Sequence, residues 1–338
     1  MTVKTKLPAI VQKGQALVRK PRLDELVDEF TKAQDVRESS RDTYRKGVKK
    51  FLQWLRARGI TSPSRETLLE YKDELRESGL AAYSVSSYVG AVRKFFTWLE
   101  TTRGLPNIAK DIKGARRTRG FRKDPLTLDQ ALELMGSVDR AELRGLRDYA
   151  LIGLMLTTGL RTVEVIRANV GDLRQEGGEA RLWIQGKGRD EKDEFSLLPA
   201  ETLKPLHEYL KARGPARPEA PLFSSLSNRN GGERLTTRTL RRIVKDRLRA
   251  IGIDSDRLTA HSTRHTAITL ALQAGATLQE AQALARHEKI ETTLIYAHNV
   301  DRLKQAPERK VAALLAGNGS NTSNTSNTVL PKIERAPL

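Results

Sequence analysis

The sequence predicts a mainly α-helical protein of two domains, with a small β-hairpin among the helices of the second domain. Apolar residues recur at helical spacing through most of the chain from residue 23 to residue 316. A stretch rich in Gly, Pro and basic residues, 104–125, separates two such regions. In the second region, two short strand-like segments flank a glycine-rich turn. A chain of 338 residues is long enough to bury a separate core in each domain.

The composition favours a polyanionic partner. Lys and Arg number 60 against 41 Asp and Glu, which gives a formal net charge of +19. Such a surplus indicates nucleic acid ahead of an anionic membrane surface. The absence of Cys excludes a disulfide framework and a thiolate metal site. The chain has no run of about 18 apolar residues and no apolar segment near its N-terminus, so we expect no membrane span and no secretory signal. These features are typical of a cytoplasmic protein.

Both ends of the chain are predicted to lie outside the folded domains. Residues 1–22 contain basic residues and no acidic residue, which indicates a basic flexible arm that is either simply solvated or bound to phosphates. Residues 317–338 begin with a low-complexity run of Asn, Ser and Thr that has nothing to bury. We expect this tail to be disordered.

The first domain, 23–103, is predicted to consist of four helices. The clearest begins near Ser39 and Ser40, which are good N-cap residues, and carries an apolar face opposite a basic one. A second long helix runs from about 85 to 99, and shorter helices cover 23–32 and 67–76. The apolar stripes are interpreted as core and contain no cofactor box.

The segment 104–125 is predicted to be a basic linker between the domains. It is punctuated by Gly and Pro and carries several Lys and Arg side chains. A linker that crosses a DNA backbone would have this composition, and so would an ordinary solvated linker.

The second domain, 126–316, is predicted to begin with a helix capped by the box Thr127-Leu-Asp-Gln130. An apolar helix from 143 to 157 follows and ends at Gly159, which suits a left-handed C-cap. The next helix begins at once, and its backbone N–H groups and dipole would favour an anion at its start.

Arg161 lies at this helix start, with Glu164 one turn further on. Two interpretations of Arg161 are open: an anion-binding arginine whose guanidinium Glu164 fixes, or a surface arginine simply paired with Glu164. Two predicted strands come next, 181–185 and 194–198, joined by a glycine-rich, charged turn that contains Lys187 and Lys192.

A strongly basic helix is predicted from 236 to about 251, after a helix over 199–213 and a loop over 214–235. Half of its surface must face solvent or phosphate, because a single Asp balances six basic residues. A capping box at 277–280 then places His287 at or just beyond the end of a later helix.

Four residues suited to phosphate chemistry occur in order near the end of this domain: His261, Arg264, His287 and Tyr296. An arginine fork binds phosphate, a histidine moves protons near neutral pH, and a tyrosine hydroxyl can act as a nucleophile. Each residue alone has an ordinary interpretation: His261 as a helix cap, Tyr296 as a core aromatic, Arg264 and His287 as surface residues. Their order and spacing together are much less common.

This constellation resembles the tyrosine recombinases, the integrase and Xer-type family of site-specific DNA recombinases. In that family the active site is an early arginine, a lysine on a β-hairpin, His-x-x-Arg, a His or Trp, and the tyrosine. The matching positions in this sequence are Arg161, Lys187, His261, Arg264, His287 and Tyr296. Lys192 is the second candidate for the lysine. The first domain likewise resembles the family's core-binding domain, and the second its mixed α/β catalytic domain.

Two positions depart from the family's usual pattern. Arg286 precedes His287 where the family usually has Gly, and Thr263 stands where Leu is usual. Neither departure removes a catalytic group, although Arg286 could alter packing beside the site. His265 and His298 are expected to lie next to the site or at the surface.

The resemblance implies that the protein cuts and rejoins DNA through a 3′-phosphotyrosyl intermediate, with strand exchange through a Holliday junction and without a cofactor or metal. The two arginines would hold the non-bridging oxygens of the scissile phosphate, and His287 would add a hydrogen bond. Tyr296 would attack phosphorus, His261 would assist proton transfer at the tyrosine, and Lys187 would protonate the departing 5′-oxygen.

The implied partners are double-stranded DNA recombination sites and further copies of the chain, as a tetramer on two DNA sites at the nucleoid. An accessory DNA-bending protein or a second recombinase could also take part. A short helix from Pro307, with an apolar edge of Val311, Leu314 and Leu315, would pack into a neighbouring protomer or fold back on its own domain. Two other classes stay open: a type IB topoisomerase-like strand transferase and a non-enzymatic nucleic-acid-binding protein.

Overall fold

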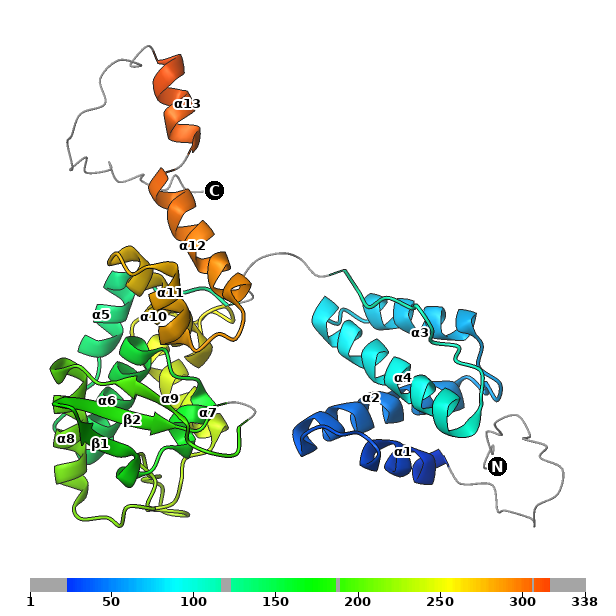
Figure 1. The fold of residues 1–338 in the computed structure, drawn as a ribbon, viewed down its shortest axis with the longest axis horizontal. Helices are drawn as coiled ribbons and strands as arrows, with labels where there is room; N and C mark the ends of the chain where they lie inside the picture. Colours follow the sequence, from blue (N-terminus) through cyan, green and yellow to red (C-terminus); the bar gives the residue numbers. More distant parts are fainter. Residues whose placement is uncertain (1–22, 117–122, 187–188, 306, 317–338) are drawn as a thin grey trace. The chain divides into compact units, whose positions relative to one another are not determined.

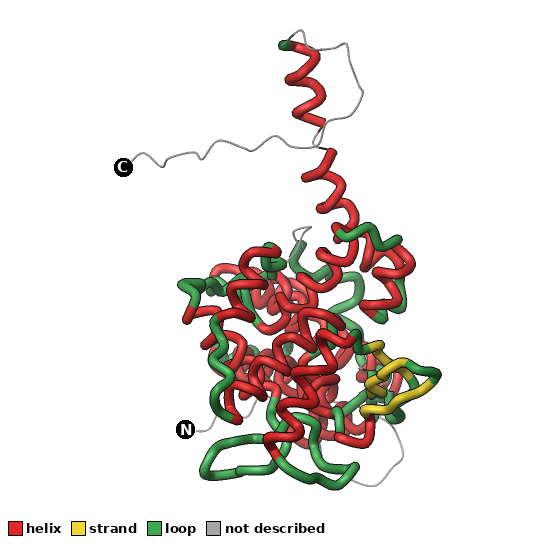
Figure 2. The backbone as a smooth tube through the Cα atoms, turned by 90° about the vertical axis from the view of Figure 1, so that its left-hand side faces the viewer, coloured by secondary structure: helices red, strands yellow, loops and turns green. Residues whose placement is uncertain are grey.

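The computed structural model describes residues 23–116, 123–186, 189–305 and 307–316 (Figure 1). The chain divides into two compact units, Met1–Arg119 and Gly120–Leu338. Helices dominate both units, and the strands gather in one small sheet of the second unit (Figure 2). The predicted mainly α, two-domain fold is confirmed.

The first unit contains the four predicted helices. They are α1 Leu23–Lys32, α2 Glu38–Ala57, α3 Arg65–Glu77 and α4 Ala82–Arg103. The predicted N-cap of α2 was wrong, because Ser39 and Ser40 lie inside its first turn. The helix starts earlier at Glu38, whose carboxylate interacts favourably with the positive end of the helix dipole.

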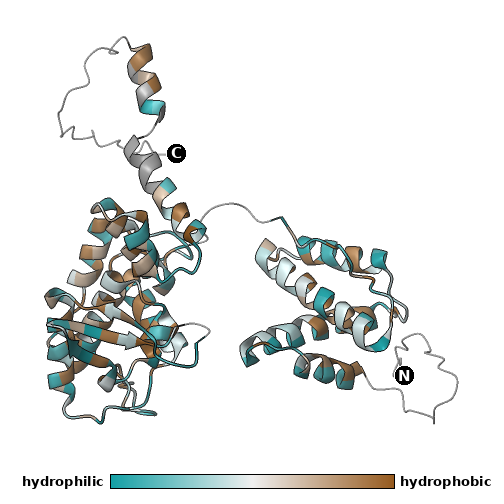
Figure 3. Cartoon of the chain, in the orientation of Figure 1, coloured by the Kyte–Doolittle hydropathy of each residue, from teal (hydrophilic) through white to brown (hydrophobic). Residues whose placement is uncertain are grey.

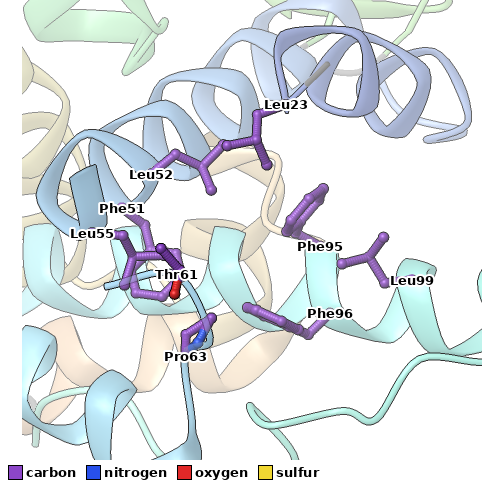
Figure 4. Close-up of a pocket in the computed structure, with 9 residues that line it drawn as sticks. All are labelled: Leu23, Phe51, Leu52, Leu55, Thr61, Pro63, Phe95, Phe96 and Leu99. Carbon is purple, nitrogen blue, oxygen red and sulfur yellow. The ribbon is translucent and has the colours of Figure 1, made fainter. Parts of the chain in front are cut away.

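An aromatic cluster holds the first unit together. Phe30 and Phe95 meet edge to face with ring centroids 5.3 Å apart, and Phe51 and Tyr71 do so at 5.0 Å. Such pairs add to the stabilisation that apolar burial supplies. A small apolar pocket opens among α1, α2 and α4 (Figure 4). Apart from the Thr61 hydroxyl its lining is apolar, and it offers no group for phosphate chemistry.

Of the predicted linker 104–125, the part from 104 to 116 packs against the helices of the first unit. Ala109 and Ile112 are buried in its core, and the Ser86 hydroxyl donates a hydrogen bond to the Ala115 carbonyl over 3.1 Å. The predictions for the arm 1–22, for 117–122 and for the tail 317–338 lie outside the described residues.

The second unit is built around the apolar helix α6, which packs on α8 and α10. Its helices are α5 Leu128–Gly136, α6 Leu143–Thr158, α7 Thr162–Arg167, α8 Ala200–Arg213, α9 Thr237–Ala250, α10 Ala260–Gln273, α11 Leu278–Ala285, α12 Ile290–Gln305 and α13 Pro307–Leu315. Both predicted capping boxes form: Thr127 accepts from the Gln130 N–H, and Thr277 from the Glu280 N–H. No helix in the described ranges is long and apolar enough to cross a membrane.

The sheet is antiparallel and has three strands, β1 Leu173–Glu176, β2 Glu179–Ile184 and β3 Glu194–Leu197, in that order. The predicted hairpin is β2 and β3, which pair Trp183 with Phe195. Strand β1 was not predicted, because its sequence Leu-Arg-Gln-Glu lacks the β-branched and aromatic residues that mark a strand.

Candidate active site

The first predicted site residue lies where α6 meets α7. Gly159 adopts a left-handed conformation, with φ of 61°, and ends α6. Arg161 follows as the N-cap residue of α7, and its Nη1 donates to Glu164 Oε1 over 2.7 Å. The Arg161 backbone N–H donates to the other oxygen, Oε2, over 2.8 Å. Glu164 is fully buried, so this carboxylate fixes the guanidinium in place.

Arg264 on α10 lies beside Arg161 and is only 3% exposed. Its Nη1 donates to the Gly159 carbonyl over 2.7 Å, and its Nη2 donates to the Ala285 carbonyl at the end of α11. Burial, then the positive charges of Arg161 and Arg286, lower the pKa of Arg264 to about 9. The side chain therefore stays charged at neutral pH and links the ends of α6 and α11.

His287 lies just beyond the end of α11, as predicted. Its Nδ1 makes a 2.9 Å hydrogen bond with the hydroxyl of the buried Thr293, which fixes the ring orientation. Burial, then the charges of Arg264 and Arg161, lower the pKa of His287 to about 4. The imidazole is therefore neutral at pH 7.

Tyr296 on α12 is 4% exposed, and its ring lies next to those of His265 and His287. Its hydroxyl is 2.6 Å from Nδ1 of His265, and its ring centroid is 6.1 Å from that of His287. Burial raises the pKa of Tyr296 to about 12, an effect that Arg264 and Arg161 oppose. The structure thus brings together four of the predicted residues: Arg161, Arg264, His287 and Tyr296.

His265 is the residue of this cluster to which the sequence analysis gave no specific role. Burial, then the neighbouring charges of His261 and Arg264, lower its pKa to about 4, so at neutral pH its ring is uncharged. The sequence feature that could have identified His265 is its position directly after Arg264 and one helical turn after His261. The rings of His261 and His265 pack edge to face with centroids 4.7 Å apart.

His261 is exposed and lies one turn before His265 on α10. Loss of hydration, then the charges of Arg264, Arg161, Arg241 and Lys123, lower its pKa. The last two residues extend the positive field of the site onto α9 and the start of the second unit. The predicted separation of α9 into an apolar face and a basic face is confirmed. Leu240, Val244 and Leu248 are buried, whereas Arg238, Arg241 and Arg242 are exposed.

The predicted lysine, Lys187, lies outside the described residues. The second candidate, Lys192, forms an ion pair with the nearly buried Asp172, close to strand β1. This ion pair therefore ties the Lys192 ammonium group to the residue that directly precedes strand β1. In the described ranges, no three His, Asp or Glu side chains gather where they could hold a metal ion.

Two family models match the chain. Residues 125–302 match the phage integrase family, and residues 23–102 match the phage integrase N-terminal SAM-like domain. A tyrosine recombinase of Synechococcus elongatus is 32% identical over 230 residues, which cover 68% of this chain and 71% of that protein.

Two solved structures show the same fold. The XerH site-specific recombinase in a post-cleavage complex with a palindromic difH substrate has a TM-score of 0.68 and 23% identity, covering 86% of this chain and 84% of that one. A lambda integrase tetramer bound to a Holliday junction has a TM-score of 0.63 and 16% identity, covering 81% of this chain and 76% of that one.

The family match spans more than half of the chain, so the chain belongs to the phage integrase family. Its curated relatives and its fold place it among the tyrosine site-specific recombinases, enzymes that break and rejoin DNA.

Proposed function

We propose that Arg161, Arg264, His287 and Tyr296 form the strand-cleavage site of this recombinase, with Lys187 as a further member. The observation that carries the proposal is the position of the Tyr296 hydroxyl. It lies 2.6 Å from a neutral imidazole nitrogen, and Arg264 and Arg161 act on it electrostatically. A hydroxyl beside a proton acceptor, in the field of two guanidinium cations, is suited to attack a phosphodiester.

In the proposed cleavage step, the Tyr296 oxygen forms a bond to phosphorus while the bond from phosphorus to the 5′-oxygen breaks. The tyrosine proton passes to Nδ1 of His265, and the 5′-oxygen takes a proton from Lys187. The product is a 3′-phosphotyrosine, which retains the bond energy needed for rejoining. Attack by a 5′-hydroxyl on this linkage reverses each transfer.

Arg161 and Arg264 are proposed to bind the two non-bridging oxygens, where negative charge grows as the fifth bond to phosphorus forms. Removing one such donor typically costs about 10²–10³ in rate. Glu164 holds the first guanidinium, and two backbone carbonyls hold the second, so neither has to reorganise during the reaction. His287, held by Thr293, is proposed to donate from its other ring nitrogen to the same oxygens.

The positive field beyond the cluster supports a path for the DNA backbone past α9. Exposed arginines on that helix would contact phosphates on either side of the cleaved bond.

Strand exchange through a Holliday junction requires two DNA sites, and we propose a tetramer in which α13 connects protomers. We also propose that the protein acts at the nucleoid in the cytoplasm.

The experiment begins by selecting a binding site from a random duplex library with Tyr296→Phe. A nicked suicide duplex is then built on the selected site. We expect the parental protein to form a covalent adduct through Tyr296, identified by peptide mapping. Tyr296→Phe should bind the same duplex equally well and form no adduct. An adduct in that variant, or none in the parent, contradicts the proposed site.

A further inference from the structure

Arg286 holds a backbone conformation that suits glycine. It caps α11 with φ of 51°, in the left-handed region. A residue with a Cβ atom is strained in this region, and glycine avoids the strain. The Arg286 side chain is nevertheless only 7% exposed and extends back into the site. Its contacts must therefore compensate for both the strained backbone and the buried charge.

The contacts of Arg286 centre on Glu164. Arg286 Nη2 donates to Glu164 Oε2 over 3.3 Å, and Nη1 donates to the Leu284 carbonyl over 2.9 Å. Its Nε is buried and has no hydrogen-bond partner within the described part of the chain. Glu164 Oε2 is also the oxygen that accepts from the Arg161 backbone N–H. Two arginines thus share one fully buried carboxylate.

This sharing determines the charge that the site offers to phosphate. Arg161 and Arg286 bind the Glu164 carboxylate, and Arg264 lies within its electrostatic reach. Together these three guanidinium groups and one carboxylate carry a net charge of two positive units. A phosphodiester carries one negative charge, and a second develops as the fifth bond to phosphorus forms. Without Arg286, the Glu164 carboxylate would cancel one of the two arginines that face the substrate.

We propose that Arg286 is a positioning residue that neutralises Glu164 and thereby leaves the full charge of Arg161 and Arg264 for the scissile phosphate. The inference rests on the proposed cleavage site. Arg286 acts through Glu164 and touches no substrate atom. Its neighbours serve the same site: the Ala285 carbonyl holds Arg264, and His287 is held by Thr293. The left-handed turn therefore directs three consecutive residues toward one phosphate.

Three variants separate the side chain from the turn. Arg286→Gly keeps the turn and relieves its strain, Arg286→Met keeps the strain and removes the charge, and Arg286→Lys keeps the charge. The measurement is the single-turnover rate of covalent adduct formation on the suicide duplex, at protein concentrations that saturate binding. We expect the Gly and Met variants to be slower by about tenfold or more, with Lys restoring part of the rate. Thermal unfolding checks that each variant is folded.

A double-mutant cycle with Glu164→Gln tests the mechanism. Because glutamine carries no charge to neutralise, Arg286→Met should cost much less in that background than in the parent. Equal costs in both backgrounds, or a parental rate for Arg286→Gly, overturn the proposal. Adduct formation by the parent and its loss in Tyr296→Phe test the cleavage site separately, so the two proposals fail in distinguishable ways.

Discussion

At the scale of single residues, the hydrogen bond between Tyr296 and His265 leads to a test of proton transfer. If Nδ1 of His265 accepts the tyrosine proton, His265→Ala should slow adduct formation by about 100-fold or more. His261→Ala should have a smaller effect, because His261 is exposed whereas the buried His265 makes the 2.6 Å hydrogen bond with the tyrosine hydroxyl. Quenched single-turnover cleavage of the suicide duplex measures both rates. A larger defect in His261→Ala would return the proton-accepting role to that residue.

The lowered pKa values of His265 and His287 predict how stability depends on pH. Burial holds both values near 4, below the value of about 6.5 in an unfolded chain. The unfolded state therefore binds more protons below pH 6.5, and stability is lost as pH falls from 6.5 towards 4. Thermal unfolding should occur at a lower temperature at pH 5 than at pH 7.5. In folded His265→Asn the difference should be smaller, and an unchanged difference would exclude His265 as a contributor.

The role of Lys187 stays a prediction, and a change of leaving group tests it. A 5′-bridging phosphorothiolate needs no proton to depart, because a thiolate is a good leaving group. Lys187→Ala should therefore cleave this substrate far better than a normal phosphodiester. Equal defects on both substrates would assign the general acid to another residue.

The sequence predicted which residues of the candidate site lie together better than the role proposed for each. Arg161, Arg264, His287 and Tyr296 could be selected because the family resemblance gives their order, and capping signals place Arg161 and His287 at helix ends. The choice between His261 and His265 could not be made in this way. Both lie on α10 one turn apart, and only the packing of α12 against α10 decides which ring meets the tyrosine.

At the scale of secondary-structure elements, the junction of α6 and α7 holds both arginines of the site. Gly159→Ala would place a Cβ 3.5 Å from that of Ala267, an ordinary contact, but at φ of 61°. The strained backbone should lower stability by about 1–2 kcal/mol. It should also slow cleavage, because the Gly159 carbonyl holds Arg264. Urea unfolding and adduct formation measure the two effects.

A matched control for this variant is Gly177→Ala, in the turn between β1 and β2, where φ is 62°. The strain is the same, but none of the site's side chains is held there. We expect a similar loss of stability with parental cleavage. A comparable loss of cleavage in both variants would mean that strain, and not the position of Arg264, explains the result for Gly159.

Elements with strong periodicity or a capping box were predicted closely, as α5 and α11 illustrate. Those stabilised mainly by tertiary contacts were not. Strand β1 exists because it pairs with β2, and its own side chains give little sign of it. In the same way, the basic charge of 104–116 suggested a linker, whereas burial of Ala109 and Ile112 attaches the segment to the first unit.

At the scale of the whole molecule, the exposed apolar residues of α13 lead to a prediction about how copies of the protein associate. Val311, Leu314 and Leu315 are exposed along it, Leu315 by 84%. Figure 3 shows the hydrophobic positions of this helix in brown. Apolar side chains in this arrangement are typical of an interface. A chain that ends at Gln305 should bind a single half-site almost normally but fail to pair two DNA sites. A chain that ends at Gly317 should do both. Gel-shift assays and Holliday-junction yield distinguish them, and parental yield from the shorter chain would exclude α13 as a connection.

Burial shields the Tyr296 hydroxyl when no DNA is bound. A phenol with a pKa near 12 that is almost closed off from solvent reacts poorly with oxidants, acylating agents and stray electrophiles. As the proposed nucleophile, this hydroxyl would meet a phosphate in reactive geometry only when DNA binds against the arginines. The packing of α12 against α10 therefore limits side reactions at the residue that we propose to attack DNA.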